Sequence, residues 1–294
     1  MRFSGQGMMS HTASTTISRY FTNTRGKALS TGWFGLSTAE FLMPVTIIYA
    51  LTIMDWRNIW IIISVAIILF LPMVSYFLVK EVKLSSREDD NKVIKENIKQ
   101  WKRSEVIKDY RFIIIALNML AMPWIATGIF VYQSFILSAK NWGEYTIAQS
   151  FMVYSIASVL TLFVAGYLID KFTSRKLLIY MNIPLLISLL ILIYFQSPVS
   201  SFFFLGLIGV SNGFANVLGS STWAELYGVK FIGSIKALTT ALMVFSTAFG
   251  TALFGLMIDF DFSIEQISMI SGGYILISLI LLFSIKNKLN PTIL

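Results

Sequence analysis

The sequence predicts an all-α integral membrane protein with about nine transmembrane helices. Two features of composition and one of pattern support this class. Of the 294 residues, 56% are hydrophobic and only 13% are charged, whereas a soluble domain carries roughly a quarter charged residues. The charges gather in clusters between long apolar segments. These segments lack the period-two alternation of membrane strands, so helices are favoured.

Each apolar segment is long enough to cross the roughly 30 Å hydrocarbon core of a bilayer at about 1.5 Å per helical residue. A spanning helix also satisfies its own backbone hydrogen bonds, which lipid cannot do. We expect spans over residues 2–20, 28–51, 57–79, 112–138, 145–169, 177–196, 200–225, 235–258 and 266–285.

The positions of the cations predict the orientation of these spans. Only three of the 23 lysines and arginines, Arg2, Arg57 and Lys140, fall on one side of the membrane. The others, Lys236 among them, fall on the opposite side, and an excess of Lys and Arg marks the cytoplasmic side. The C-terminus is then cytoplasmic, and we expect a multi-pass protein of a bacterial cytoplasmic membrane.

A charged segment divides the spans into two groups. Residues 1–79 hold the first three spans, residues 80–111 form a cytoplasmic linker, and residues 112–294 hold a bundle of six. Within the linker, five apolar residues roughly share one face at helical spacing: Val93, Ile94, Ile98, Trp101 and Ile107. This pattern predicts an amphipathic surface helix, with a solvated linker as the alternative.

A short repeat relates the two groups of spans. Lys27-Ala-Leu-Ser opens the second predicted span, and Lys236-Ala-Leu-Thr opens the eighth. The repeat predicts two like halves with a period of about 205 residues. Because the second half then has three spans without a counterpart, we expect this chain to be the truncated form of a protein with twelve spans. A protein with nine spans remains the alternative.

The turn between the fifth and sixth predicted spans carries the most informative motif. Gly166 precedes Asp170 by four residues, and the cations Lys171, Arg175 and Lys176 follow. The glycine allows a neighbouring helix to approach closely. The carboxylate can pair with these cations or cap the N-terminus of another helix. Such contacts would close a cytoplasmic gate, whereas the alternative is that the charges only set topology.

This motif resembles the signature loop of the major facilitator superfamily of secondary transporters. The signature usually has a second glycine and a further basic residue, and here Thr173 and Ser174 replace them. The resemblance maps the chain onto helices four to twelve of a twelve-helix fold. It implies alternating access to a small solute without a cofactor, by a protein that works as a monomer in the bilayer.

The start of the chain provides a second resemblance. Arg2 is followed by Gly5 and Gly7, and the family's fourth helix often begins with an arginine and a glycine pair. In the family this arginine is linked to proton coupling, so the resemblance implies that Arg2 belongs to the proton pathway.

Ionisable and polar residues within the spans are candidates for the substrate or proton pathway. His11 and Glu40 fall in the middle of antiparallel spans, where they could exchange a proton or simply hydrogen-bond. The resemblance places the fourth and seventh spans of this chain beside the central path. The candidates on these two spans are Asn118, Trp124, Tyr132, Gln133, Asn212 and Asn216.

The other classes of function fit the composition less well. The chain has no cysteine and one histidine, so we expect no metal site. The cations lie in membrane loops and do not indicate nucleic acid, and no phosphate-binding Gly-Lys-Ser/Thr loop indicates an ATP-driven pump. A transporter is the leading hypothesis. An inactive fragment, or a membrane-embedded enzyme, remains the alternative.

Overall fold

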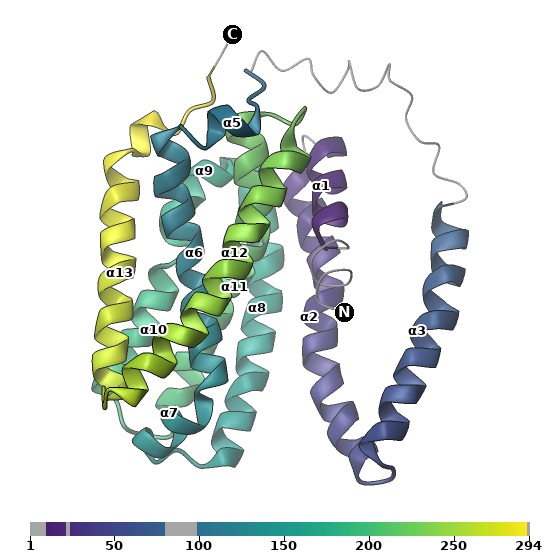
Figure 1. Ribbon diagram of the computed structural model, residues 1–294, viewed down its shortest axis with the longest axis vertical. Coiled ribbons are helices and arrows are strands. Elements are labelled where there is room, and N and C mark those ends of the chain that lie inside the picture. Colours follow the sequence, from purple (N-terminus) through teal and green to yellow (C-terminus); the bar gives the residue numbers. More distant parts are fainter. Residues whose placement is uncertain (1–9, 22–23, 80–98, 293–294) are drawn as a thin grey trace.

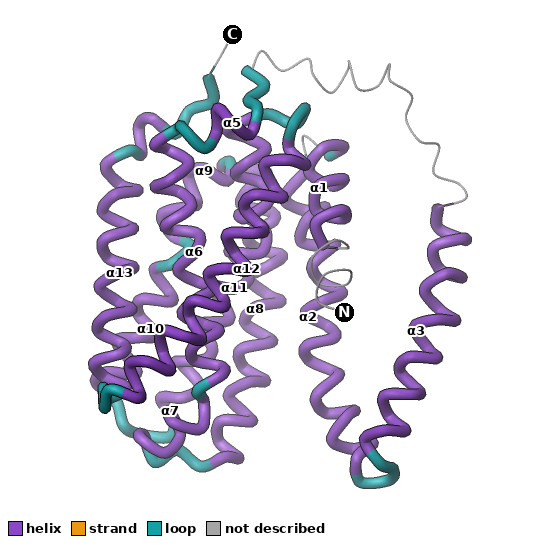
Figure 2. The backbone as a smooth tube through the Cα atoms, in the orientation of Figure 1, coloured by secondary structure: helices purple, strands orange, loops and turns teal. Residues whose placement is uncertain are grey.

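The computed structural model describes residues 10–21, 24–79 and 99–292. Within these ranges every regular element is a helix and no strand occurs, which confirms the predicted all-α class (Figure 2). The long helices lie side by side and their connecting turns gather at two ends (Figure 1). We call the end that carries Asp170 the basic end and the end that carries Asp259 the acidic end.

The helices follow the apolar segments of the sequence closely. Their bounds are α1 Ser10–Tyr20, α2 Arg25–Leu51, α3 Trp56–Val79, α5 Arg103–Val106, α6 Tyr110–Val131, α7 Gln133–Lys140, α8 Glu144–Phe172, α9 Ser174–Leu177, η2 Leu178–Tyr180, α10 Ile183–Tyr194, α11 Ser200–Tyr227, α12 Ile232–Asp259, α13 Ile264–Ser284 and η3 Lys286–Lys288.

Seven segments of the described chain are long and apolar enough to cross a membrane. They coincide with the predicted spans from residue 57 onwards, although their ends shift by a few residues. The helix α2, with 27 residues, matches the predicted span 28–51. The helix α1 covers the second half of the predicted span 2–20, and the first half lies outside the described residues.

The predicted span 177–196 is not one continuous helix. It starts at the last residue of α9 and continues through a single 3-10 turn into the 12-residue α10. Pro184 in the first turn of α10 cannot continue a helix that arrives from Tyr180, because it lacks an N–H and its ring crowds the preceding turn. The prediction missed this break because the segment is uniformly apolar.

Buried hydrogen bonds join this break to two neighbouring helices, α6 and α11. Asn182 Nδ2 donates to the Asn118 carbonyl of α6 at 2.6 Å. Ser211 Oγ of α11 donates to the Met181 carbonyl at 2.7 Å and accepts from the Leu185 N–H at 3.0 Å. An irregular backbone within a membrane needs such partners. The break is therefore fixed by side chains that are distant in sequence.

Two glycines hold α11 close against α8. A Cβ added at Gly209 would meet the Tyr154 carbonyl, and one added at Gly213 would lie 2.6 Å from the Ser158 carbonyl. Two glycines one helical turn apart, as Gly209 and Gly213 are in the sequence, predict a close helix contact. Both glycines lie directly on the α8 backbone. This contact joins two of the longest helices of the bundle.

The helices α2 and α3 differ from the others in burial. At the basic end α2 packs against α8, and Leu29 is only 1% exposed. Towards the acidic end the same helix is open, with Tyr49 68% exposed. The helix α3 stands apart from the rest of the bundle (Figure 1) and exposes large apolar side chains such as Phe70. In a bilayer such surfaces contact lipid.

The predicted surface helix of the linker is described only over its last part, because residues 80–98 lie outside the described ranges. The last part contains only the four-residue α5. The backbone N–H of Trp101 donates to the Tyr227 carbonyl at 3.0 Å, and the two rings pack edge to face. The Lys102 N–H and the ammonium of Lys99 lower the pKa of Glu105 below its ordinary value.

Candidate functional site

A cavity of about 490 Å³ lies between the first helices of the chain and the bundle that follows. His11 of α1 and Trp33 of α2 contribute from one side, and residues of α6, α8, α11 and α12 contribute from the other. The volume is in the range of sites for small molecules. In the described part of the chain, no Asp or Glu lines this cavity.

Three of the residues predicted for the pathway line the cavity: His11, Asn212 and Asn216. Asn212 Nδ2 donates to Ser158 Oγ of α8 at 3.1 Å, which fixes its amide against the wall. His11 Nδ1 is buried and has no hydrogen-bond partner among the described residues. Asn212 and Asn216 share a face of α11 because they are one helical turn apart.

Two other candidates, Asn118 and Trp124, point away from the cavity. Asn118 Nδ2 donates to Ser278 Oγ of α13 at 3.4 Å, and its carbonyl accepts from Asn182. The Trp124 ring packs edge to face against Phe249, Phe254 and Tyr274. Both side chains therefore join α6 to its neighbours. The same helix turns Met122, Pro123 and Thr127 into the cavity instead.

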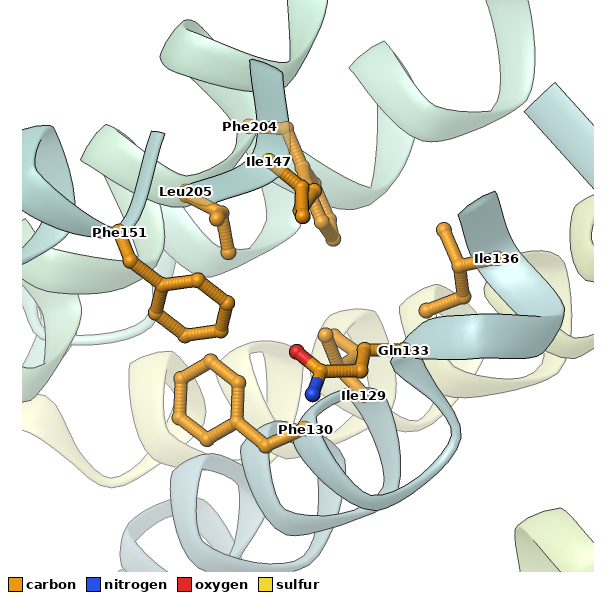
Figure 3. A pocket seen from close by; sticks show the side chains of 8 residues that line it. All are labelled: Ile129, Phe130, Gln133, Ile136, Ile147, Phe151, Phe204 and Leu205. Atoms are coloured by element: carbon orange, nitrogen blue, oxygen red, sulfur yellow. The ribbon is translucent and has the colours of Figure 1, made fainter. Parts of the chain in front are cut away.

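Tyr132 and Gln133 lie near the acidic end, where α6 stops and α7 begins. The Tyr132 hydroxyl lies against Gly255 of α12. Gln133 lines a separate apolar hollow with Phe130, Phe151 and other residues of α6, α7, α8 and α11 (Figure 3). This hollow has a volume of about 10 Å³, which is room for about one water molecule, so it cannot hold a solute.

The remaining two candidates are not described. Arg2 lies outside the described residues, and so does the side chain of Glu40, although its backbone belongs to α2. His11 lies nine residues from the basic-end terminus of α1, whereas Glu40 lies fifteen residues into α2. At about 1.5 Å per residue their depths differ by about 9 Å.

Sequence reasoning missed Lys236, which it counted among the topology-setting cations. The side chain is 4% exposed and lines the cavity near its basic end. Its Nζ donates to Ser220 Oγ at 2.9 Å. The repeat does not predict that Lys236 is buried, because the equivalent Lys27 is exposed. The signal in the sequence was the i, i+4 series of polar residues on α11, which ends at Ser220, the partner of Lys236.

At the basic end, Asp170 of α8 caps the first turn of α2. Its Oδ1 accepts from the Gly26 N–H at 2.7 Å, and its Oδ2 accepts from the Lys27 N–H at 3.1 Å. The residue before this helix, Thr24, supplies no side-chain cap. Asp170 therefore satisfies free donors at a helix end whose dipole favours a negative charge. This is the predicted contact with another helix's N-terminus.

Close packing surrounds this cap. A Cβ at Gly166 would lie 2.7 Å from Ser30 Oγ and 2.8 Å from the Gly26 carbonyl. In turn, a Cβ at Gly26 would meet the Gly166 carbonyl. The predicted close approach at Gly166 is confirmed, and its partner is a second glycine on α2. Together the two glycines let the backbones of α2 and α8 touch beside Asp170.

The cations of the motif separate into two kinds. Arg175 forms an ion pair with Glu225 at 3.5 Å, and its Nη1 donates to the Leu289 carbonyl at 2.9 Å. Glu225 also caps α9 by accepting from the Ser174 N–H at 3.0 Å. Arg175 thus ties the motif to the C-terminal segment. Lys171 and Lys176 are exposed, as expected for cations that interact with lipid headgroups or water.

Thr173 stands where the family signature has its second glycine, and its backbone explains that preference. Its φ of 74° and ψ of 147° lie in a region that glycine occupies far more easily than any residue with a Cβ. The Thr173 hydroxyl is buried and has no partner among the described residues. The threonine therefore carries backbone strain without a compensating hydrogen bond.

Replacing Thr173 by Gly is expected to stabilise the protein by about 1 kcal/mol. Relief of strain contributes about 1–3 kcal/mol, and the added freedom of glycine in the unfolded chain offsets part of it. The thermal midpoint in detergent should rise by about 2 °C. Thr173→Ala is the matched control, since it loses the hydroxyl but keeps the strain. Equal midpoints for the two variants would contradict this account.

The helices of membrane-crossing length and the absence of charged side chains over most of their surface define an integral, multi-pass membrane protein. A family model described as the Major Facilitator Superfamily matches residues 4–251, which is most of the sequence. The chain therefore belongs to the Major Facilitator Superfamily, whose members are transporters, and it is a membrane transporter. No protein of individually curated function matches it.

Proposed function

We propose that this chain moves a small solute across the membrane by alternating access, with the central cavity as the solute site. The observation that carries the proposal is the position of the cavity. Its wall comes from α1 and α2 on one side and from α6, α8, α11 and α12 on the other. A site between two groups of helices is exposed in turn to either side when the groups rock against each other.

The two ends of the α2–α8 contact support a rocking motion. At the basic end the Asp170 cap and the paired glycines join the helices. Nearby, α1 approaches α12, and a Cβ at Gly233 would lie 3.7 Å from Thr15 Cγ2. Towards the acidic end α2 is exposed. We assign the basic end to the cytoplasm from its cations, so this arrangement closes the cytoplasmic gate.

Proton coupling is a further part of the proposal. His11 is an ionisable group on the cavity wall, and its Nδ1 has no partner among the described residues. Exchange of a proton at the His11 imidazole would let solute movement drive or follow a proton. The part assigned to Glu40 stays a prediction, because its side chain lies outside the described residues.

The test uses purified protein in liposomes loaded with a pH-sensitive dye. A panel of small solutes is added with a valinomycin clamp on the membrane potential, and solute-dependent proton flux is recorded. We expect at least one solute to produce flux, and Asn216→Ala to reduce it by about tenfold because the residue faces the solute. Gln133→Ala, whose side chain faces a hollow too small for a solute, is the matched control and should be unaffected.

A separate arm uses radiolabelled solute with and without a pH gradient. Uptake that does not depend on the pH gradient would contradict proton coupling but would leave the proposal of transport intact. Loss of uptake that is equal in Asn216→Ala and Gln133→Ala would contradict the assignment of the cavity as the solute site.

A further inference from the structure

Lys236 is the one charged residue whose side chain the bundle buries in the cavity wall, among the residues that the structure describes there. In the described part of the chain no Asp or Glu forms an ion pair with it. An ammonium group without a counter-charge is costly to keep within a membrane protein. The position of this ammonium group beside a cavity therefore points to a ligand that supplies the negative charge.

The hydrogen-bonding capacity of Lys236 is also incompletely used. The ammonium has three N–H donors, and the described residues accept only one of them, through Ser220 Oγ at 2.9 Å. The remaining donors lie in a wall that faces the cavity. Oxygen atoms of an anion are the natural acceptors for them, because charge-assisted hydrogen bonds to carboxylates are among the strongest in proteins.

A polar stripe leads from Lys236 along α11. Asn212, Asn216 and Ser220 recur every four residues, so they lie on one face over about 12 Å. All three line the cavity. In the described chain Asn216 forms no side-chain hydrogen bond within the protein, which leaves its amide for a ligand. The stripe is long enough to contact the uncharged part of a small molecule.

We propose that the cavity binds a small monocarboxylate, with its carboxylate held by Lys236 and Ser220 and its polar or apolar remainder lying along Asn216 and Asn212. The charge balance favours one carboxylate, because Lys236 is the only Lys, Arg, Asp or Glu among the described lining residues. His11 lines the same cavity as Lys236. Protonation of His11 would therefore add to the attraction for an anion.

This inference names the substrate class of the proposed transport site and rests on that proposal for its role in transport. The presence of the anion site itself is tested without transport. The sequence contains no cysteine, so a single introduced cysteine reports on its surroundings alone. Thr240 lines the cavity one turn of α12 beyond Lys236, and Ser197, which is exposed in the turn before α11, serves as a reference position.

The experiment compares the rates at which an anionic and a cationic methanethiosulfonate reagent, bearing a sulfonate and a trimethylammonium group, modify Thr240→Cys. A positive charge at Lys236 raises the anion-to-cation rate ratio above that of Ser197→Cys. Adding Lys236→Gln should lower the ratio by about tenfold or more, and Lys236→Arg should preserve it. Lys27→Gln is the matched control from the same four-residue repeat, and it should leave the ratio unchanged.

The ligand class is tested by protection of Thr240→Cys with acetate, lactate and benzoate, each paired with its uncharged amide. At least one carboxylate should slow modification at least fivefold, and its amide should not. Lys236→Gln should abolish this protection. A rate ratio insensitive to Lys236→Gln, or a cysteine at position 240 that neither reagent reaches, would overturn the anion site.

Three outcomes would overturn the assignment to monocarboxylates. They are that none of these acids protects, that acid and amide protect equally, or that inorganic phosphate protects and the acids do not. These outcomes are separate from the failure of the proposed function. If the rate ratio depends on Lys236 and a carboxylate protects, but no solute produces flux in liposomes, the anion site stands and the transport role does not.

Discussion

Replacing Asp170 by Ala is expected to open the basic end of the protein. The substitution removes two charge-assisted hydrogen bonds to the first turn of α2. Such a loss is worth about 2 kcal/mol, which changes the balance between two conformations about 30-fold. Spin labels at Thr31→Cys in α2 and Lys230→Cys in the α11–α12 turn, both exposed sites, should report a new population at longer distance.

The neighbouring residue provides the control for this result. Lys171 is exposed, and among the described residues its ammonium contacts only the Phe172 ring, at 5.2 Å from the centroid. Lys171→Ala should therefore leave the distance distribution unchanged. If both variants behave like the unmodified protein, Asp170 does not hold the two groups of helices together.

A steric substitution is expected to separate α2 from α8 at the basic end without a change of charge. In Gly166→Ala the new methyl group collides with Gly26 and Ser30 of α2, so α2 must move away from α8. Gly35→Ala is the matched control, because a Cβ there meets nothing within 4 Å. Agreement between Gly166→Ala and Asp170→Ala would identify the α2–α8 seam itself, rather than the aspartate alone, as the gate.

Replacing Gly209 by Ala is expected to cost about 1 kcal/mol of stability. The added methyl group meets the Tyr154 carbonyl of α8, and overpacking of this kind typically costs about 1–3 kcal/mol. The usual preference of helices for Ala over Gly, about 1 kcal/mol, acts in the opposite direction. The thermal midpoint of the purified protein should fall by a few degrees.

Gly219 is the matched control for this substitution, because it belongs to the same helix α11 and a Cβ there meets nothing within 4 Å. Gly219→Ala should leave the midpoint unchanged or raise it slightly. A common shift for Gly209→Ala and Gly219→Ala would show that helix preference, rather than contact with α8, determines the result.

Several features of the fold could be predicted because they depend on residues that are close together in the sequence. The apolar lengths place the long helices, because a span must satisfy its own backbone. The spacing of Gly209 and Gly213 correctly indicates a close helix contact. Asp170 at the end of a span is correctly assigned as a candidate cap for another helix. In each case one residue, or a pair one turn apart, carries the information.

Other features depend on partners that are distant in sequence. Asn118 and Asn216 are both amides on apolar helices, yet the first donates to Ser278 of α13 and the second faces the cavity. A membrane helix is apolar all round, so its hydropathy pattern does not reveal which side faces a neighbour. Lys27 and Lys236 open the same four-residue motif, and only the packing around α12 buries the second.

The interruption between α9 and α10 has a mechanical consequence. The Asn182 side chain in the break donates to the Asn118 carbonyl of α6, and the free Met181 carbonyl and Leu185 N–H bond to Ser211 of α11. These buried hydrogen bonds link three helices. They oppose sliding of the three helices against one another, because sliding would break them. Any large relative movement must then take place elsewhere. The contact between α2 and α8, held by one carboxylate and two glycines, is where the proposed opening would occur.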